Sequence, residues 1–303
     1  MSSAPRSPST SVSAVVSDVD GTLVTDDKML TARTEAAVAA LHRHGIAFTI
    51  ISSRPPRGMA MLVERLGISA PIAGFNGGML STPGLAAIEQ HLLSPEVAQR
   101  AADVISAHGA QIWVFGVQDW FVRDISGSYV DLEERTVRFG PTVVENFDSC
   151  LACAAKIVAV SEDFELLTKL EQDIGATFAG QATVARSQRY YLDFTHPLAN
   201  KGVALTKLSS LLAIPAAEIA VIGDGGNDVA MFERSGLSIA MGNASPQVQR
   251  AADFVTDRNS QDGFARAIEW FILAGNRLNV PGPTASAGLK GPLKPTGEGD
   301  RAW

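Results

Sequence analysis

Hydrophobic and polar positions alternate in a regular rhythm near both ends of the chain. In the first block, apolar runs at 13–17 and 46–51 predict strands, and amphipathic segments at 31–44 and up to residue 66 predict helices. Strands that alternate with helices of this length are typical of parallel βαβ units. The rhythm returns later in the chain, where we expect a helix at 201–212, a strand at 219–222, a helix at 228–235, a strand at 237–240 and a helix at 264–273. The two blocks are therefore predicted to form one α/β, Rossmann-like parallel sheet.

The middle of the chain has a different pattern, in which strand-like segments are less regularly separated by helices. We expect strands at 112–115, 120–122, 157–160, 182–185 and 190–194, and helices at 94–108 and 162–174. Such mixing is typical of an α+β unit with antiparallel strands. The sequence therefore predicts an α+β cap domain inserted into the α/β core.

These patterns divide the chain into a split core and an insert. The core is predicted at 12–80 and 197–275, and the cap at 81–196. Ser, Pro and Thr dominate the first residues, and Gly, Pro and Lys are frequent in the last ones, so 1–11 and 276–303 are expected to be disordered. With 303 residues, the chain is long enough for two domains that each bury a core.

Charge and cysteine content narrow the class of partner. The chain has 25 Lys+Arg against 32 Asp+Glu, a formal charge of −7, and no basic block, so nucleic acid is not expected as a partner. No apolar run reaches the roughly 20 residues that span a bilayer, and no signal peptide is recognisable, so we expect a cytoplasmic protein without membrane contact. Cys150 and Cys153 have CxxC spacing, but without further ligands they predict ordinary thiols rather than a redox or zinc site.

Polar residues follow the predicted strands, where ligands bind in open parallel sheets. Two pairs of carboxylates, Asp18 with Asp20 and Asp224 with Asp228, meet if their strands are neighbours. Such a cluster repels itself and an anionic substrate unless a divalent cation binds, and carboxylate oxygens suit Mg²⁺. Serine and lysine donors for phosphate oxygens complete the set. The four segments are Asp18-Val19-Asp20-Gly21-Thr22, Ser52-Ser53-Arg54, Lys201-Gly202 and Gly223-Asp224-Gly225-Gly226-Asn227-Asp228.

In order and spacing, these four segments resemble the motifs of the haloacid dehalogenase superfamily, and in particular its Cof-type phosphatase branch. The resemblance covers about residues 12–274 and places the cap between the second and third motifs, where that branch has a large α+β insert. It implies a Mg²⁺-dependent phosphatase that hydrolyses a small organic phosphate monoester, such as a sugar phosphate or cofactor phosphate, through an aspartyl-phosphate.

The resemblance also implies a role for each motif residue. Asp18 is expected to be the nucleophile and Asp20 the general acid and base. Ser52, Ser53, Lys201 and Asn227 are expected to bind the phosphate, and Asp18, Asp20, Asp224 and Asp228 to form the metal site, with Asp20 contributing its backbone carbonyl. Asp228 is either close to the metal or a partner that orients Lys201, and both interpretations stay open.

Two positions depart from the usual motifs, and other functions remain open. Ser53 stands where the second motif usually has Gly, and Gly78 stands where Ala often precedes the cap. The alternative functions are a phosphosugar mutase on the same core and a non-catalytic phosphate-sensing protein, with redox chemistry at the cysteines a more distant one. The expected partner is a small phosphorylated metabolite, and the chain is expected to be a monomer or homodimer.

Overall fold

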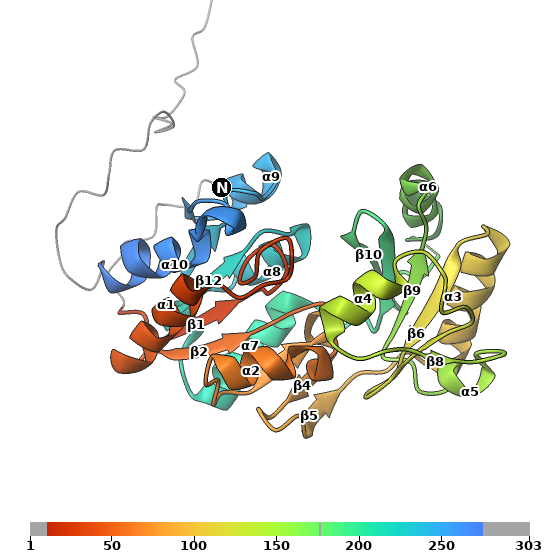
Figure 1. The fold of residues 1–303 in the computed structure, drawn as a ribbon, viewed down its shortest axis with the longest axis horizontal. Coiled ribbons are helices and arrows are strands. Elements are labelled where there is room, and N and C mark those ends of the chain that lie inside the picture. The colour runs from red at the N-terminus through yellow and green to blue at the C-terminus, as the bar shows by residue number, and fades with distance from the viewer. Residues whose placement is uncertain (1–10, 176, 275–303) are drawn as a thin grey trace, which may run out of the picture.

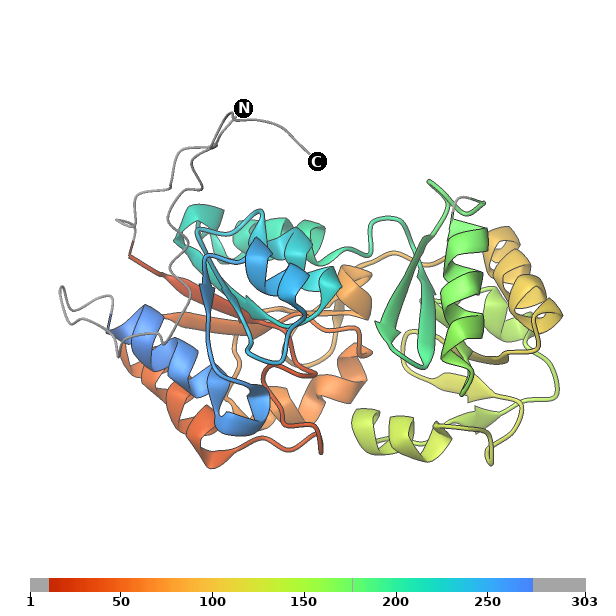
Figure 2. The same cartoon turned by 90° about the horizontal axis from the view of Figure 1, so that it is seen from above.

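The computed structural model describes residues 11–175 and 177–274 of the chain. Apart from Ser11, the segments predicted to be disordered lie outside these residues. A core with helices on both faces of a sheet lies beside a second unit with its own sheet, and two linkers connect them (Figures 1 and 2). Within the described residues, no helix combines the length and apolar character needed to cross a membrane.

The core sheet has five parallel strands in the order β14-β13-β12-β1-β2. Strand β1 lies between β12 and β2, and its Ser17 is opposite Ile222 of β12 and Ile50 of β2. The strands are β1 (Ala14–Ser17), β2 (Ala47–Ile50), β12 (Ile219–Gly223), β13 (Leu237–Ala240) and β14 (Phe254–Val255). The predicted α/β fold with a parallel core sheet is confirmed.

Helices cover both faces of this sheet, because its strands bury apolar side chains on each side. One face packs against α1 (Ala32–Arg43), α2 (Ala60–Arg65) and α10 (Gly263–Ala267), and the other against α7 (Lys201–Leu212), α8 (Val229–Phe232) and α9 (Pro246–Ala251). Thr31 caps α1 by accepting a hydrogen bond from the backbone N–H of Thr34, and Asn200 caps α7 in the same way from Gly202.

The inserted unit contains a six-stranded mixed sheet in the order β10-β11-β9-β6-β7-β8. All its neighbouring strands are antiparallel except β7 and β8. The strands are β6 (Gln111–Phe115), β7 (Trp120–Val122), β8 (Thr142–Val143), β9 (Lys156–Val160), β10 (Thr183–Gln188) and β11 (Tyr191–Thr195). The inserted α+β cap is therefore confirmed as a feature of the fold.

Helices α3 (Pro95–Ala107), α5 (Asp148–Leu151) and α6 (Phe164–Gly175) lie on the outer face of the cap sheet. Its other face is turned toward the core, together with α4 (Val130–Val137) (Figure 1). Trp113, Phe115 and Trp120 are buried on this inner face, where they pack with one another. Their packing fits the role of sheet core.

A small antiparallel sheet of β3 (Ile72–Gly74), β4 (Met79–Ser81) and β5 (Ala87–Gln90) was not predicted. It continues from the core, because Ile51 at the end of β2 forms a parallel bridge with Ala73. The sheet runs across residue 81, the predicted start of the cap, and the exact domain boundaries stay a prediction.

Candidate active site

The parallel register of β1 and β12 brings two of the sequence motifs together. The backbone N–H of Asp18 donates to the carbonyl of Ile222 (2.9 Å), so the first motif begins beside the end of β12. One carboxylate oxygen each from Asp18, Asp224 and Asp228 lies within 4.8 Å of the others. The two acidic motifs were predicted to lie close together. The structure brings together three of their four carboxylates, and the fourth, that of Asp20, lies apart.

Lys201 lies at the start of α7 and joins two of these acids. Its side chain is about 1% exposed, and Nζ donates to Oδ1 of Asp18 (2.5 Å) and Oδ1 of Asp228 (2.6 Å). The two carboxylates raise the pKa of the Lys201 ammonium, although burial opposes them. Lys201 is therefore a fixed positive charge in the floor of the site.

Asp228 is fully buried, and both of its carboxylate oxygens are occupied. Oδ1 accepts from Lys201, while Oδ2 accepts from the backbone N–H groups of Asp224 (2.9 Å) and Gly225 (2.8 Å). Asp228 thus holds both Lys201 and the turn that carries Asp224. This arrangement favours the interpretation in which Asp228 orients its neighbours.

Asp224 is held by side chains from two other loops. Thr22 Oγ1 donates to its Oδ1 (2.8 Å), and Asn243 Nδ2 donates to its Oδ2 (3.2 Å). Burial, followed by the charge of Asp228, raises the pKa of Asp224 to about 7. Burial also raises the pKa of Asp18 well above its ordinary value, and Lys201 only partly opposes this effect.

The chemistry of this acid cluster fits a divalent cation. Burial and mutual repulsion disfavour the ionised forms of Asp18 and Asp224, and one ammonium group does not compensate three carboxylates. A hard cation bound by carboxylate oxygens would remove this penalty. The cluster of Asp18, Asp224 and Asp228 can therefore hold a metal ion.

The Asp20 side chain has different partners from the acid cluster. Arg54 donates two hydrogen bonds to it, from Nε to Oδ2 and from Nη2 to Oδ1, each 2.7 Å long. Lys28 Nζ also donates to Oδ1 (2.8 Å). Although Asp20 is buried, these two cations hold its pKa well below its usual range. The third donor of Arg54, Nη1, reaches the carbonyl of Thr136 in α4 of the cap (2.8 Å).

The second motif lies beside Asp20 at the end of β2. Ser52 is buried, and its hydroxyl accepts from the backbone N–H of Arg54 (3.2 Å). The carbonyl of Ser53 accepts from Lys156 Nζ of the cap (3.3 Å). The loop therefore touches the cap through both Arg54 and Ser53.

Asn227 lies in the turn after β12 and donates from Nδ2 to Oδ1 of Asn76 (2.9 Å). The backbone N–H of Asn76 in turn donates to the carbonyl of Ser52 (2.8 Å), and Asn76 has a left-handed conformation with φ of 57°. The predicted phosphate-binding residues Ser52 and Asn227 are thus linked through the turn that precedes β4.

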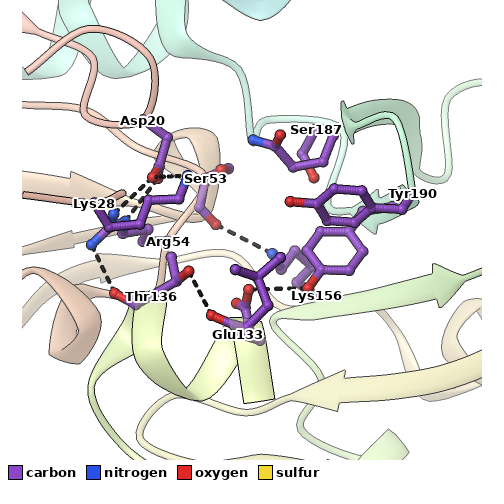
Figure 3. Close-up of a pocket in the computed structure, with 12 residues that line it drawn as sticks. Asp20, Lys28, Ser53, Arg54, Glu133, Thr136, Lys156, Ser187 and Tyr190 are labelled. Carbon is purple, nitrogen blue, oxygen red and sulfur yellow. Dashed lines mark hydrogen bonds and ion pairs between the residues drawn. The ribbon is translucent and has the colours of Figure 1, made fainter. Parts of the chain in front are cut away.

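A polar pocket of about 30 Å³ opens where the cap meets these motifs (Figure 3). Core and cap both contribute to it, so a molecule bound there contacts the two domains at once. Its lining consists of Asp20, Lys28, Ser53, Arg54, Leu132, Glu133, Thr136, Lys156, Ser187, Gln188, Tyr190 and Tyr191.

Several of these residues were not among the predicted site residues. Asn243, which donates to Asp224 outside this pocket, lies three residues after the end of β13, and the expectation that ligands bind beyond strand ends also points to it. No sequence pattern marks Lys28, Lys156 or Glu133 as site residues. They reach the pocket because of how the first loop and the cap pack. The cysteines lie in the cap, and both are free thiols, with Cys150 buried and Cys153 exposed.

The chain matches known phosphatases over most of its length. Residues 15–268 match the family model of the haloacid dehalogenase-like hydrolases. A putative phosphatase of Haemophilus influenzae is 27% identical over 257 residues, covering 84% of this chain and 97% of that protein. A 5-amino-6-(5-phospho-D-ribitylamino)uracil phosphatase of Bacillus subtilis is 24% identical over 262 residues, covering 86% and 96%.

Solved structures share the same architecture. A haloacid dehalogenase-like hydrolase from Bacteroides thetaiotaomicron superposes with a TM-score of 0.77 at 26% identity, covering 86% of this chain and 99% of that one. The subclass IIB sugar phosphatase BT4131 has a TM-score of 0.76 at 21% identity, covering 86% and 99%, which shows the common fold.

Proposed function

This chain belongs to the haloacid dehalogenase-like hydrolases and is a phosphatase, and from this premise we propose that it hydrolyses a small organic phosphate monoester with Mg²⁺ through an aspartyl-phosphate. The predicted resemblance to the superfamily and its Cof-type branch is confirmed. The observation that carries the mechanism is the environment of Asp18, which lies at the end of β1 and whose Oδ1 accepts a hydrogen bond from Lys201 at 2.5 Å.

The first half of the reaction forms a bond between a carboxylate oxygen of Asp18 and phosphorus, and it breaks the bond from phosphorus to the leaving oxygen. Lys201 orients the nucleophile through its Oδ1 contact and offsets charge on the phosphate. The Ser52 hydroxyl and the Asn227 amide contribute donors for the phosphoryl oxygens. Asp20 donates its proton to the leaving alkoxide, which departs as an alcohol.

In the second half, Asp20 takes a proton from a water molecule that attacks the phosphorus of the aspartyl-phosphate. The bond from Asp18 to phosphorus then breaks, which releases inorganic phosphate and restores the carboxylate. Arg54 and Lys28 stabilise ionised Asp20, so it is prepared to act as a base. Its action as an acid requires that the Arg54 contact loosens when substrate enters.

We assign the metal site to Asp18 and Asp224, whose ionised forms are disfavoured by burial in the absence of a cation. When bound there, Mg²⁺ supplies positive charge against the carboxylates and the phosphoryl oxygens. The backbone carbonyl of Asp20 is a further expected ligand. Asp228, with both oxygens already bonded, positions Lys201 and Asp224, and its direct ligation stays a prediction.

The test replaces Asp18 with Asn and follows hydrolysis of p-nitrophenyl phosphate in Mg²⁺ by release of free phosphate. Loss of the nucleophile is expected to reduce kcat at least about 10³-fold, whereas the exposed acid Asp27, changed to Asn, serves as the matched control. Activity of Asp18→Asn near that of the control would refute the nucleophile assignment. Full turnover in excess EDTA would refute the metal requirement.

A further inference from the structure

The first linker between core and cap is very short. The backbone N–H of His91 donates to the carbonyl of Gly78 (2.8 Å), which extends the small sheet beside the core. Two residues later, the backbone N–H of Leu93 donates to the carbonyl of Ala154 in the cap (2.9 Å). The chain therefore passes from one domain to the other between His91 and Leu93, and His91 belongs to the core side of this crossing.

The second linker has the opposite arrangement. Thr195, the last residue of β11, pairs with Lys156 in the cap sheet, and Asn200 caps α7 of the core. His196 directly follows β11, so it belongs to the cap side. Its ring stacks on that of His91, with 5.0 Å between centroids and an interplanar angle of 21°. The stack thus joins a residue fixed to the core to one fixed to the cap, and rotation of the cap about the linkers must disturb it.

The surroundings of His196 favour its neutral form. Its Nδ1 accepts a hydrogen bond from the backbone N–H of Leu198 (3.1 Å), so this nitrogen carries no proton in the stacked arrangement. A proton on Nδ1 would make it a donor that faces another donor, and the bond would be lost. Burial, followed by the neighbouring His91, also holds the pKa of His196 below its ordinary value. Protonation of His196 and this geometry therefore oppose each other.

The charged groups that face this histidine pair are Glu89 of β5 and Lys207 of α7. Nε2 of His91 lies 2.8 Å from Oε1 of Glu89, and Nζ of Lys207 lies 3.0 Å from the other oxygen of the same carboxylate. A proton on His91 is therefore compensated by Glu89, which Lys207 shares. Within the described part of the chain, His196 forms no ion pair with a carboxylate. On acidification, a proton on His196 therefore places two like charges on the stacked rings.

Core and cap are in contact across the pocket in this structure, where Arg54 Nη1 donates to the carbonyl of Thr136 (2.8 Å). Rotation of the cap about the linkers would break this contact and open the pocket. We infer that His91 and His196 form a pH-sensitive hinge. While His196 is neutral, the stack holds the cap against the core, and when both rings are protonated, their repulsion favours the open cap. This inference does not depend on which ester the site hydrolyses.

Energy transfer between two dyes, one on each domain, tests the hinge in solution. The exposed thiol of Cys153 labels the cap, Cys150→Ser removes the buried thiol, and Arg43→Cys provides an exposed label site in α1 of the core. Between pH 8 and pH 5, the fraction of molecules with low transfer efficiency, which have the open cap, should rise at least about threefold. Other titrating groups contribute equally in the variants below, so differences between proteins isolate the hinge.

Two variants of the labelled protein should lose this response. His196→Asn keeps an acceptor for the Leu198 N–H but takes up no proton, and His91→Phe keeps a stacked ring without a charge, so the open fraction in each should change less than about 1.5-fold. His108→Asn, at the exposed end of α3, is the matched control and should respond like the parent protein. The pKa of His196, followed by NMR, should rise in His91→Phe. An open fraction that is independent of pH in the parent protein, or an equal response in His196→Asn, overturns the inference.

Discussion

Because of Asp224, the stability of the metal-free protein should decrease as the pH rises from acidic to neutral values. Its pKa is raised from an ordinary 3.8 to about 7, mainly by burial and then by Asp228. The folded state therefore binds a proton over a range in which the unfolded state has lost it. Stability from this group is fully present below pH 3.8 and is lost as the pH rises toward 7.

The size of the effect follows from the two pKa values. At 1.36 kcal/mol for each tenfold change in proton affinity, the full difference corresponds to about 4 kcal/mol, of which about 2–3 kcal/mol falls between pH 5 and pH 8. The raised pKa of Asp18 acts in the same direction. Asp20 has a lowered pKa, so its contribution to stability increases with pH instead. This opposite effect is confined to pH values below 3.8.

The assay is urea unfolding in EDTA at pH 5 and at pH 8, for the wild-type protein and for Asp224→Asn. From pH 5 to pH 8, the free energy of unfolding of the wild-type protein should fall by at least about 2 kcal/mol more than that of the variant. Asp27→Asn, which changes an exposed acid, should behave like the wild-type protein. Saturating Mg²⁺ should flatten the wild-type profile, because the cation stabilises the ionised carboxylates. Equal pH dependence of wild type and Asp224→Asn in EDTA would refute the reasoning.

Three other substitutions test separate parts of the site. Lys201→Met leaves the acid cluster without its ammonium and should lower the free energy of unfolding by about 3–5 kcal/mol in EDTA; a loss below about 1 kcal/mol would contradict this. Gly21→Ala places a Cβ against the Asp224 carboxylate, so half-maximal activity should need about tenfold more Mg²⁺. Gly45→Ala, with similar φ and open space, controls for backbone strain. Arg54→Met should raise the pKa of Asp20, so the alkaline limb of the kcat/KM profile, above which Asp20 no longer holds the proton it donates, should move to higher pH; an unmoved limb would argue against this pairing.

The sequence predicted the core well, because its apolar periodicity and strand-end motifs are local. The helix at 201–212 and the strand at 237–240 have the bounds that were expected. The small sheet that includes β3 was missed, since its strands are short and its turns contain glycine. Helix α4 was also missed, and it begins and ends next to residues with left-handed backbone, Tyr129 and Arg138, rather than at a recognisable cap.

The candidate site was predictable in part for the same physical reason. Asp18 and Asp224 belong to recognisable motifs that follow β1 and β12, and the parallel register of these two strands brings their ends together. The partners of Asp20 were not predictable, because Arg54 also reaches across to Thr136 of the cap. Contacts between two domains depend on how these pack, and neither hydrophobic periodicity nor strand order specifies that packing.

The two linkers between core and cap lie next to each other at His91 and His196, whose rings stack at 5.0 Å between centroids. An insert whose two ends are adjacent leaves and re-enters the host domain at one place. Its length or internal fold can therefore change without displacing the flanking strands. Evolution can therefore exchange or remodel the cap as a module. Under such exchange, phosphoryl transfer is inherited with the core, while the range of alcohols that it releases can diverge independently.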